Sequence, residues 1–324
     1  MSPEERLLEL YRTTYGTSPR VMEQLPGAGS NRHYFRLYAP EAAGDAGIPA
    51  SMIGTVGEDL AENRAFITLA DHFRERGIAV PEVYAASDDG GCYLQQDLGS
   101  RSLFAEIERG RGVGSFDSRA TGLMAQAMEL LAAVQYRGAD GLDFSVCYPD
   151  AAMNRRMIDW DLSYFKYCFL KPSGIEVPEN GLQDDFARLG DRLYGVAACA
   201  DTFMVRDFQS RNVMVTDDGM PYLIDFQGGR RGPAEYDVAS FLWQARASVP
   251  DSLRVELIDR YVAAVHKLSQ SFDEAAFRAN LPQFVLFRLL QVLGAYGFRG
   301  WMEGKSHFLQ SIPAALASVA SLLD

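Results

Sequence analysis

The stretch that decides the fold runs from residue 205 to residue 226 and reads VRDFQSRNVMVTDDGMPYLIDF. It places a carboxylate, Asp207, five residues before an amide, Asn212, and ends with a second carboxylate, Asp225, after an apolar run. Apolar segments on either side of a polar loop, with a further turn at Asp217–Gly219, are typical of a strand, a loop and a second strand. We therefore expect the two carboxylates and the amide to converge in one cleft.

Phosphoryl transfer needs this set of side chains. A carboxylate must orient the attacking hydroxyl and accept its proton, and oxygen ligands must hold Mg²⁺ against the nucleotide phosphates. Asp207 suits the role of base, whereas Asn212 and Asp225 suit those of metal ligands. In the alternative reading, the two carboxylates only cap turns of the chain.

The D-x4-N step, followed by the LIDF segment, resembles the catalytic loop and metal-binding segment of aminoglycoside phosphotransferases and eukaryotic-like kinases. The resemblance implies an ATP- and Mg²⁺-dependent enzyme that phosphorylates a hydroxyl of a small molecule. It also implies a two-lobed, protein-kinase-like α+β fold, with a small β-rich N-terminal lobe and a larger, mostly helical C-terminal lobe.

The hydrophobic pattern of the whole chain predicts the same division. We expect strands at 19–25, 31–39, 50–56, 83–87 and 91–96, with helices at 3–14 and 60–76. Beyond residue 101 we expect helices at 117–137, 152–170, 182–197, 233–247, 251–269, 273–295 and 306–323. Residues 1–97 then form a nucleotide-binding lobe, and residues 98–324 form a helical lobe that carries the catalytic loop and the substrate site.

Three segments of the first lobe are candidates for nucleotide binding. The glycine-containing run 25–32 reads LPGAGSNR and resembles a phosphate-covering loop, although such a hairpin is also an ordinary turn. By the same resemblance, a helix glutamate and the segment joining the two lobes contact the nucleotide, the latter through its backbone. The candidate residues are Gly27, Gly29, Ser30, Asn31, Glu62, Gln95, Gln96 and Leu98.

Two residues depart from the kinase pattern. Val205 stands where these enzymes usually have a histidine, two positions before the catalytic aspartate, and the expected strand at 50–56 has no lysine to hold the phosphates. Another cation must replace that lysine. Arg211, within the catalytic loop, is the first candidate and is assigned a catalytic role beside Asp207; Arg32 and Arg64 are the others.

A narrower resemblance is to bacterial amino-sugar kinases of cell-wall recycling, which phosphorylate the anomeric hydroxyl of N-acetylmuramate and N-acetylglucosamine. The segments that carry it include 62–66 (ENRAF), 96–99 (QDLG), 206–212 (RDFQSRN), 232–237 (GPAEYD) and 289–298 (LLQVLGAYGF). A sugar would lie against the helical lobe, and Arg230 could bind a carboxylate on it. The candidate substrate residues are Arg155, Asp159, Trp160, Asp161 and Arg230.

Other acceptors fit the same chemistry, namely an aminoglycoside, choline or a homoserine-type alcohol. A catalytically silent, kinase-like binding module is a further reading, which the missing lysine and Val205 motivate.

The composition and net charge of the chain limit the classes of molecule that it is expected to bind. The chain has 324 residues, of which 48% are hydrophobic and 23% charged, and its formal net charge is −12. A protein this acidic is repelled by nucleic acids and by anionic membranes, so a small-molecule partner is expected. Four scattered cysteines, no visible signal peptide and no membrane-length apolar run favour a soluble cytoplasmic protein. The oligomeric state stays open.

Overall fold

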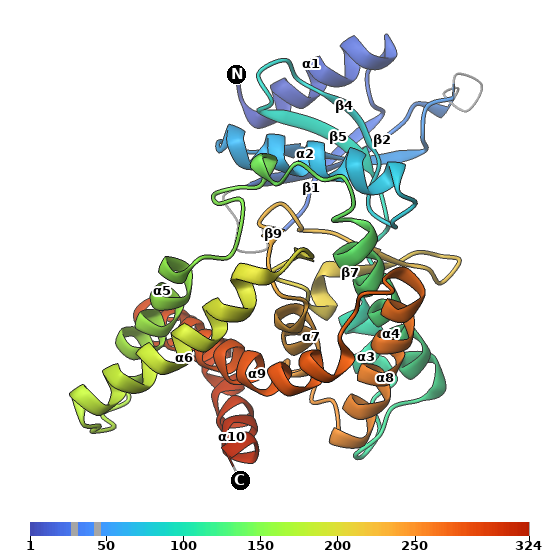
Figure 1. Ribbon diagram of the computed structural model, residues 1–324. Coiled ribbons are helices and arrows are strands. Elements are labelled where there is room, and N and C mark those ends of the chain that lie inside the picture. Colours follow the sequence, from blue (N-terminus) through green and yellow to red (C-terminus); the bar gives the residue numbers. More distant parts are fainter. Residues whose placement is uncertain (27–31, 42–46, 324) are drawn as a thin grey trace.

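The computed structural model describes residues 1–26, 32–41 and 47–323, and it has a sheet-bearing N-terminal part and a mostly helical remainder (Figure 1). The predicted α+β fold class is confirmed. Gly27, Gly29, Ser30 and Asn31, the predicted phosphate-loop contacts, lie outside the described residues.

The N-terminal part is built on one antiparallel sheet with the strand order β1-β2-β3-β5-β4. Its strands are β1 (Val21–Gln24), β2 (His33–Tyr38), β3 (Ser51–Val56), β4 (Val83–Ala86) and β5 (Cys92–Gln96). Helix α1 (Pro3–Tyr15) buries Leu7, Leu10 and Tyr11 with the apolar side chains of β2, β3 and β5. Each predicted strand of this region is confirmed, with ends that differ by a few residues.

Helix α2 (Leu60–Glu75) ties the sheet to the rest of the molecule. Asp59 caps its N-terminus by accepting hydrogen bonds from the backbone N–H groups of Ala61 and Glu62. The ring of Phe66 stacks on the ring of Phe226, with centroids 4.8 Å apart. Because Phe226 follows Asp225 directly, this packing restrains the position of the Asp225 backbone relative to α2 and the sheet.

The remaining chain is mainly helical. Its α-helices are α3 (Leu103–Arg109), α4 (Ser118–Ala132), α5 (Arg155–Phe165), α6 (Glu179–Cys199), α7 (Ala234–Leu242), α8 (Asp251–Leu268), α9 (Glu274–Gly297) and α10 (Ile312–Leu323). Helix α3, which has only seven residues, was not predicted from the sequence. Helix α7 ends at Leu242, earlier than the predicted residue 247. Residues 306–311, predicted as the start of the last helix, form a 3₁₀ segment.

The segment around the catalytic motif has four short strands where two were predicted. Strand β6 (Phe203–Met204) pairs with β9 (Arg230–Arg231), and β7 (Val213–Val215) pairs with β8 (Pro221–Leu223). The loop bearing Asp207 therefore runs from one two-stranded sheet to the other. This arrangement holds both of its ends.

Helix α9 runs through the helical part and contacts α5, α7 and α10. The segment Glu274–Met302 is long and apolar enough to span a membrane by composition, but half of its most apolar window is buried inside the protein. Its apolar character is explained by this packing.

Candidate active site

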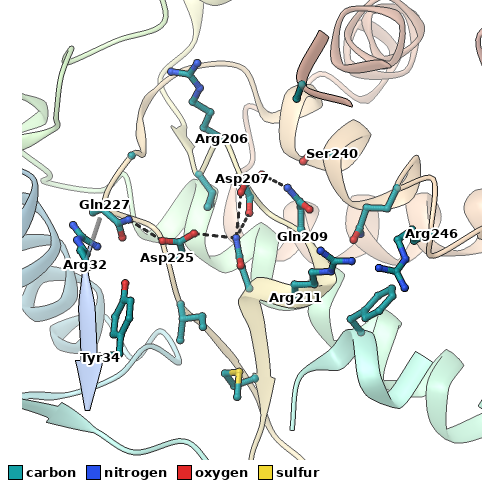
Figure 2. A pocket seen from close by; sticks show the side chains of 18 of the residues that line it. Arg32, Tyr34, Arg206, Asp207, Gln209, Arg211, Asp225, Gln227, Ser240 and Arg246 are labelled. Atoms are coloured by element: carbon teal, nitrogen blue, oxygen red, sulfur yellow. Dashed lines mark hydrogen bonds between the residues drawn. The ribbon is translucent and has the colours of Figure 1, made fainter. Parts of the chain in front are cut away.

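A cavity of about 1170 Å³ is lined by residues of both parts of the chain (Figure 2). From the sheet side it receives Glu62, Gln95, Gln96 and Leu98. From the helical side it receives Asp207, Arg211, Asn212 and Asp225. All predicted catalytic and metal residues, and every described member of the predicted nucleotide set, therefore lie on one cavity.

Asn212 joins the two carboxylates. Its Nδ2 atom lies 3.4 Å from Oδ2 of Asp207 and 3.3 Å from Oδ2 of Asp225, and it donates to the backbone oxygen of Asp207 at 3.0 Å. Figure 2 shows the two labelled carboxylates facing the same space. The convergence that the sequence predicts is therefore present.

The other oxygen of Asp207 is held by two donors. Oδ1 accepts a hydrogen bond from Nη2 of Arg288 at 3.0 Å and another from Nε2 of Gln209. The Arg288 side chain is only 9% exposed and also donates to Oγ of Ser240 at 3.1 Å. Oδ2 has only the longer contact with Nδ2 of Asn212, at 3.4 Å, and is therefore the oxygen of Asp207 that is more open to accept a proton from a bound hydroxyl.

Asp225 sits in an environment that favours a divalent cation. Its backbone has φ 61°, a left-handed conformation that costs a non-glycine residue energy and is concentrated at functional sites. Burial raises the pKa of its carboxyl, the hydrogen bond from Gln227 opposes that rise, and the Asp207 carboxylate adds to it. The side chain is nonetheless exposed toward the cavity, so a cation can reach it, and an ionised carboxylate next to a second carboxylate is stabilised by such a positive charge.

The residue types fit Mg²⁺, since a carboxylate and an amide offer hard oxygen ligands. The amide of Asn212 faces both carboxylates with its nitrogen, so it would have to turn to present its oxygen to the ion. Among the described residues, no three His, Cys, Asp or Glu side chains form a metal-binding group. The ion would therefore complete its ligand shell with phosphate oxygens and water, as Mg²⁺ usually does.

The backbone of the catalytic loop is held by Asp237 of α7. Its carboxylate accepts from the N–H groups of Val205 at 2.7 Å and Arg206 at 2.9 Å, and from Nε2 of Gln135 at 3.0 Å. Arg206 has φ 74°, so these bonds support a strained turn directly before Asp207. Asp237 is the fourth residue of α7, so its carboxylate is free of the helix N-terminus and binds the loop instead.

A cation near the helix glutamate, where the strand lysine is missing, is supplied by Arg32. Nη2 of Arg32 lies 3.3 Å from Oε1 of Glu62, and the guanidinium is buried. Ile53 of β3 lines the cavity, so the charge comes from the residue that precedes the adjacent β2. Arg211, the first choice from the sequence, lies elsewhere: its guanidinium carbon is 4.9 Å from the ring centroid of Phe104.

The five predicted substrate residues lie outside the cavity lining. Arg155 pairs with Asp159 and Asp191, and Trp160 is 78% exposed on α5. Arg230 is buried and donates to the backbone oxygens of Gly228 and Tyr148. The sequence shows which residues of an element are polar, but it does not show which of its faces meets the cavity.

Asp161 does not line the cavity, but it forms an ion pair with a residue that does. Its buried carboxylate lies 3.7 Å from Nη2 of Arg206, which does line the cavity. Burial raises the pKa of Asp161, and the Arg206 charge opposes that rise. Asp161 is therefore placed behind the cavity wall.

Sequence reasoning missed Arg288, which lies 81 residues beyond Asp207. It is a single charge within the apolar run LPQFVLFRLLQVLGAYG of α9. A lone arginine in such a run is a usable signal, because a buried charge requires a partner.

Comparisons with known proteins agree with this geometry. Residues 22–278 match the model of the phosphotransferase enzyme family. An N-acetylmuramate/N-acetylglucosamine kinase from Pseudomonas aeruginosa is 25% identical over 287 residues, covering 86% of this chain and 78% of the relative. A kinase of the same name from Pseudomonas putida is 24% identical over 332 residues, covering 99% of this chain and 89% of the relative.

Solved structures show the same fold. Choline kinase from Cryptosporidium parvum superposes with a TM-score of 0.64 at 11% identity, over 99% of this chain and 96% of that chain. Spectinomycin phosphotransferase, in complex with ADP and spectinomycin, gives a TM-score of 0.60 at 12% identity, over 97% of this chain and 98% of that chain. The chain belongs to the phosphotransferase enzyme family, has a protein-kinase-like fold and is a small-molecule kinase.

Proposed function

We propose that this protein transfers the γ-phosphate of ATP, with Mg²⁺, to the anomeric hydroxyl of an amino sugar of the N-acetylmuramate or N-acetylglucosamine type. The observation that carries the proposal is the position of Asn212, whose amide lies within 3.4 Å of both Asp207 and Asp225. These three side chains supply a base and two oxygen ligands within a single cavity.

Asp207 is the proposed base. Its Oδ1 is fixed by Arg288 and Gln209, which leaves Oδ2 to orient the sugar hydroxyl and to take its proton. The phosphoryl group then passes in line from ATP to the sugar oxygen, and ADP leaves. Because little covalent chemistry falls to the protein, the rate depends on this positioning and on charge stabilisation.

Asn212 and Asp225 are the proposed ligands of Mg²⁺, which would neutralise charge on the nucleotide phosphates. Arg32 is proposed to take the place of the strand lysine, since it is oriented by Glu62 as that lysine is in related kinases. The adenine would lie against Gln95, Gln96 and Leu98, which join the sheet to the helical part.

The amino-sugar acceptor is supported by the names of the relatives, which cover most of the chain at about a quarter identity. The solved choline kinase and spectinomycin phosphotransferase support the fold alone at their lower identities. We also propose a cytoplasmic location, because ATP is the donor, and a division into functional lobes near residues 97 and 98.

An ADP-release assay with a panel of acceptors tests the proposal. The panel contains N-acetylmuramate, N-acetylglucosamine, choline, homoserine and an aminoglycoside, each with Mg²⁺ and ATP. We expect release above the acceptor-free background with the amino sugars. Release with choline or an aminoglycoside alone would contradict the proposed acceptor, and release with none of the five would contradict the amino-sugar function.

A further inference from the structure

The charge of the cavity is opposite to that of the whole chain. The chain has 31 lysines and arginines against 43 carboxylate side chains. Among the described residues that line the cavity, eight are lysines or arginines and four are aspartates or glutamates. An acidic protein that gathers cations in one cavity creates a local field that attracts anions.

The arginines at the two ends of the cavity differ in their contacts. At the sheet end, Arg32 pairs with Glu62 and Arg36 pairs with Asp97. At the other end, Arg211 and Arg246 both lie against the ring of Phe104, with guanidinium carbons 4.9 Å and 5.3 Å from its centroid. Within the described part of the chain, no carboxylate forms an ion pair with either of them.

Two like charges on one ring repel each other. The distances to the shared centroid place the two guanidinium carbons no farther apart than about 10 Å, roughly the screening length of dilute salt. Stacking on an aromatic face restrains an arginine but leaves its N–H groups free to bind a planar anion. An anionic ligand group near both guanidinium groups would remove the repulsion and accept their hydrogen bonds.

Arg211 and Arg246 lie on the side of the catalytic residues that faces away from Arg32. In Figure 2, Arg32 and Gln227 stand at one end of the site and Arg211 and Arg246 at the other, with Asp225 and Asp207 between them. Arg211 and Arg246 line the same cavity as Arg288, the residue of α9 that holds Asp207. This is the end opposite to the proposed nucleotide cation.

We infer that Arg211 and Arg246, held on Phe104, form a subsite for a carboxylate of the acceptor. The inference rests on the proposed function, because it names the part of the amino sugar that these side chains recognise. It replaces Arg230, whose guanidinium is buried against backbone oxygens, as the carboxylate partner. It also disfavours cationic acceptors such as choline and aminoglycosides, which the same arginines would repel.

The test compares two acceptors that differ by a carboxylate-bearing ether group, N-acetylmuramate and N-acetylglucosamine. For R246Q we expect kcat/KM to fall about tenfold with N-acetylmuramate and to stay within about twofold with N-acetylglucosamine. The KM for ATP should not change. R278Q, which removes an exposed arginine of α9 that does not line the cavity, is the matched control.

Equal losses with both acceptors would overturn the subsite, and so would a rise in the KM for ATP, which would assign the arginines to the nucleotide. If the unaltered enzyme phosphorylates neither sugar, the proposed function fails, and the subsite is then judged by calorimetric binding of N-acetylmuramate alone. Affinity that is about tenfold weaker in R246Q supports it. Equal affinity, or no binding to the unaltered protein, contradicts it.

Discussion

Arg288 donates a hydrogen bond from Nη2 to Oδ1 of Asp207 at 3.0 Å, which joins helix α9 to the catalytic loop. The same guanidinium donates through Nε to Oγ of Ser240 on α7 at 3.1 Å. Since an arginine fork is planar and always charged, these bonds fix one orientation of the Asp207 carboxylate. The C-terminal helices therefore position the proposed base, although they lie far from it in sequence.

Replacing Arg288 should reduce turnover more than binding. For R288M we expect kcat to fall about 10- to 100-fold, because Asp207 loses a defined orientation, while both KM values stay within about threefold. R288K should recover part of the loss, since lysine supplies the charge but not the fork. Steady-state kinetics measures the split, with R278M on the exposed side of α9 as the control. An unchanged kcat in R288M would show that the contact does not position the base.

The Arg32–Glu62 pair should act on the nucleotide. We expect R32Q and E62Q each to raise the KM for ATP about tenfold, and the double variant to be no worse than either one, because they remove the same oriented charge. R64Q is the control: Arg64 lies on the same helix as Glu62 but does not line the cavity. Additive effects of R32Q and E62Q, or a rise confined to the acceptor KM, would argue against this role.

Metal binding should depend on pH through Asp225. Burial raises the pKa of this carboxyl, and nearby Asp207 adds to the rise. Because the folded state then binds this proton more tightly than the unfolded state, the Asp225 carboxyl contributes its full stabilisation of the fold at low pH. That contribution is lost as the pH rises through the folded-state pKa. A cation bound to the ionised form offsets the loss, so Mg²⁺ should stabilise the protein more at neutral than at acidic pH.

The measurement is the rise in melting temperature on adding Mg²⁺ with ADP, taken at about pH 7.5 and about pH 5. We expect a larger rise at the higher pH in the unaltered protein. D225N provides the baseline, because the nucleotide's own titration is the same in both proteins. If the two proteins show the same pH dependence, Asp225 does not hold the metal.

Local patterns in the sequence carried most of the prediction. The spacing of Leu60, Phe66, Leu69 and Phe73 predicts α2, and its end near Gly77 follows from the same reasoning. The D-x4-N step and the following apolar strand predict where Asp207, Asn212 and Asp225 meet, because a short loop brings its own ends together. The seven-residue helix α3 was missed, since it offers too few turns for a periodic signal.

Contacts between distant segments could not be predicted in this way. Arg32 meets a glutamate of the next helix, Asp237 binds a backbone 31 and 32 residues upstream, and Arg288 reaches Asp207 across 81 residues. These contacts depend on how the helices pack against one another, and that packing cannot be predicted from a single sequence. The predicted substrate residues lie away from the cavity for the same reason: the sequence shows which face of α5 is polar, but not which face meets the cavity.

The central claim is that Asp207 directs a phosphoryl group onto the anomeric hydroxyl of an amino sugar. Phosphorus NMR of the products from Mg²⁺, ATP and N-acetylmuramate or N-acetylglucosamine, run with the unaltered enzyme and with D207N, tests it most directly. We expect the unaltered enzyme to give a sugar phosphate coupled to the anomeric proton, and D207N to be at least about 1000-fold slower while it still binds nucleotide. A phosphate on another hydroxyl, or product formed by D207N at a comparable rate, would contradict the account.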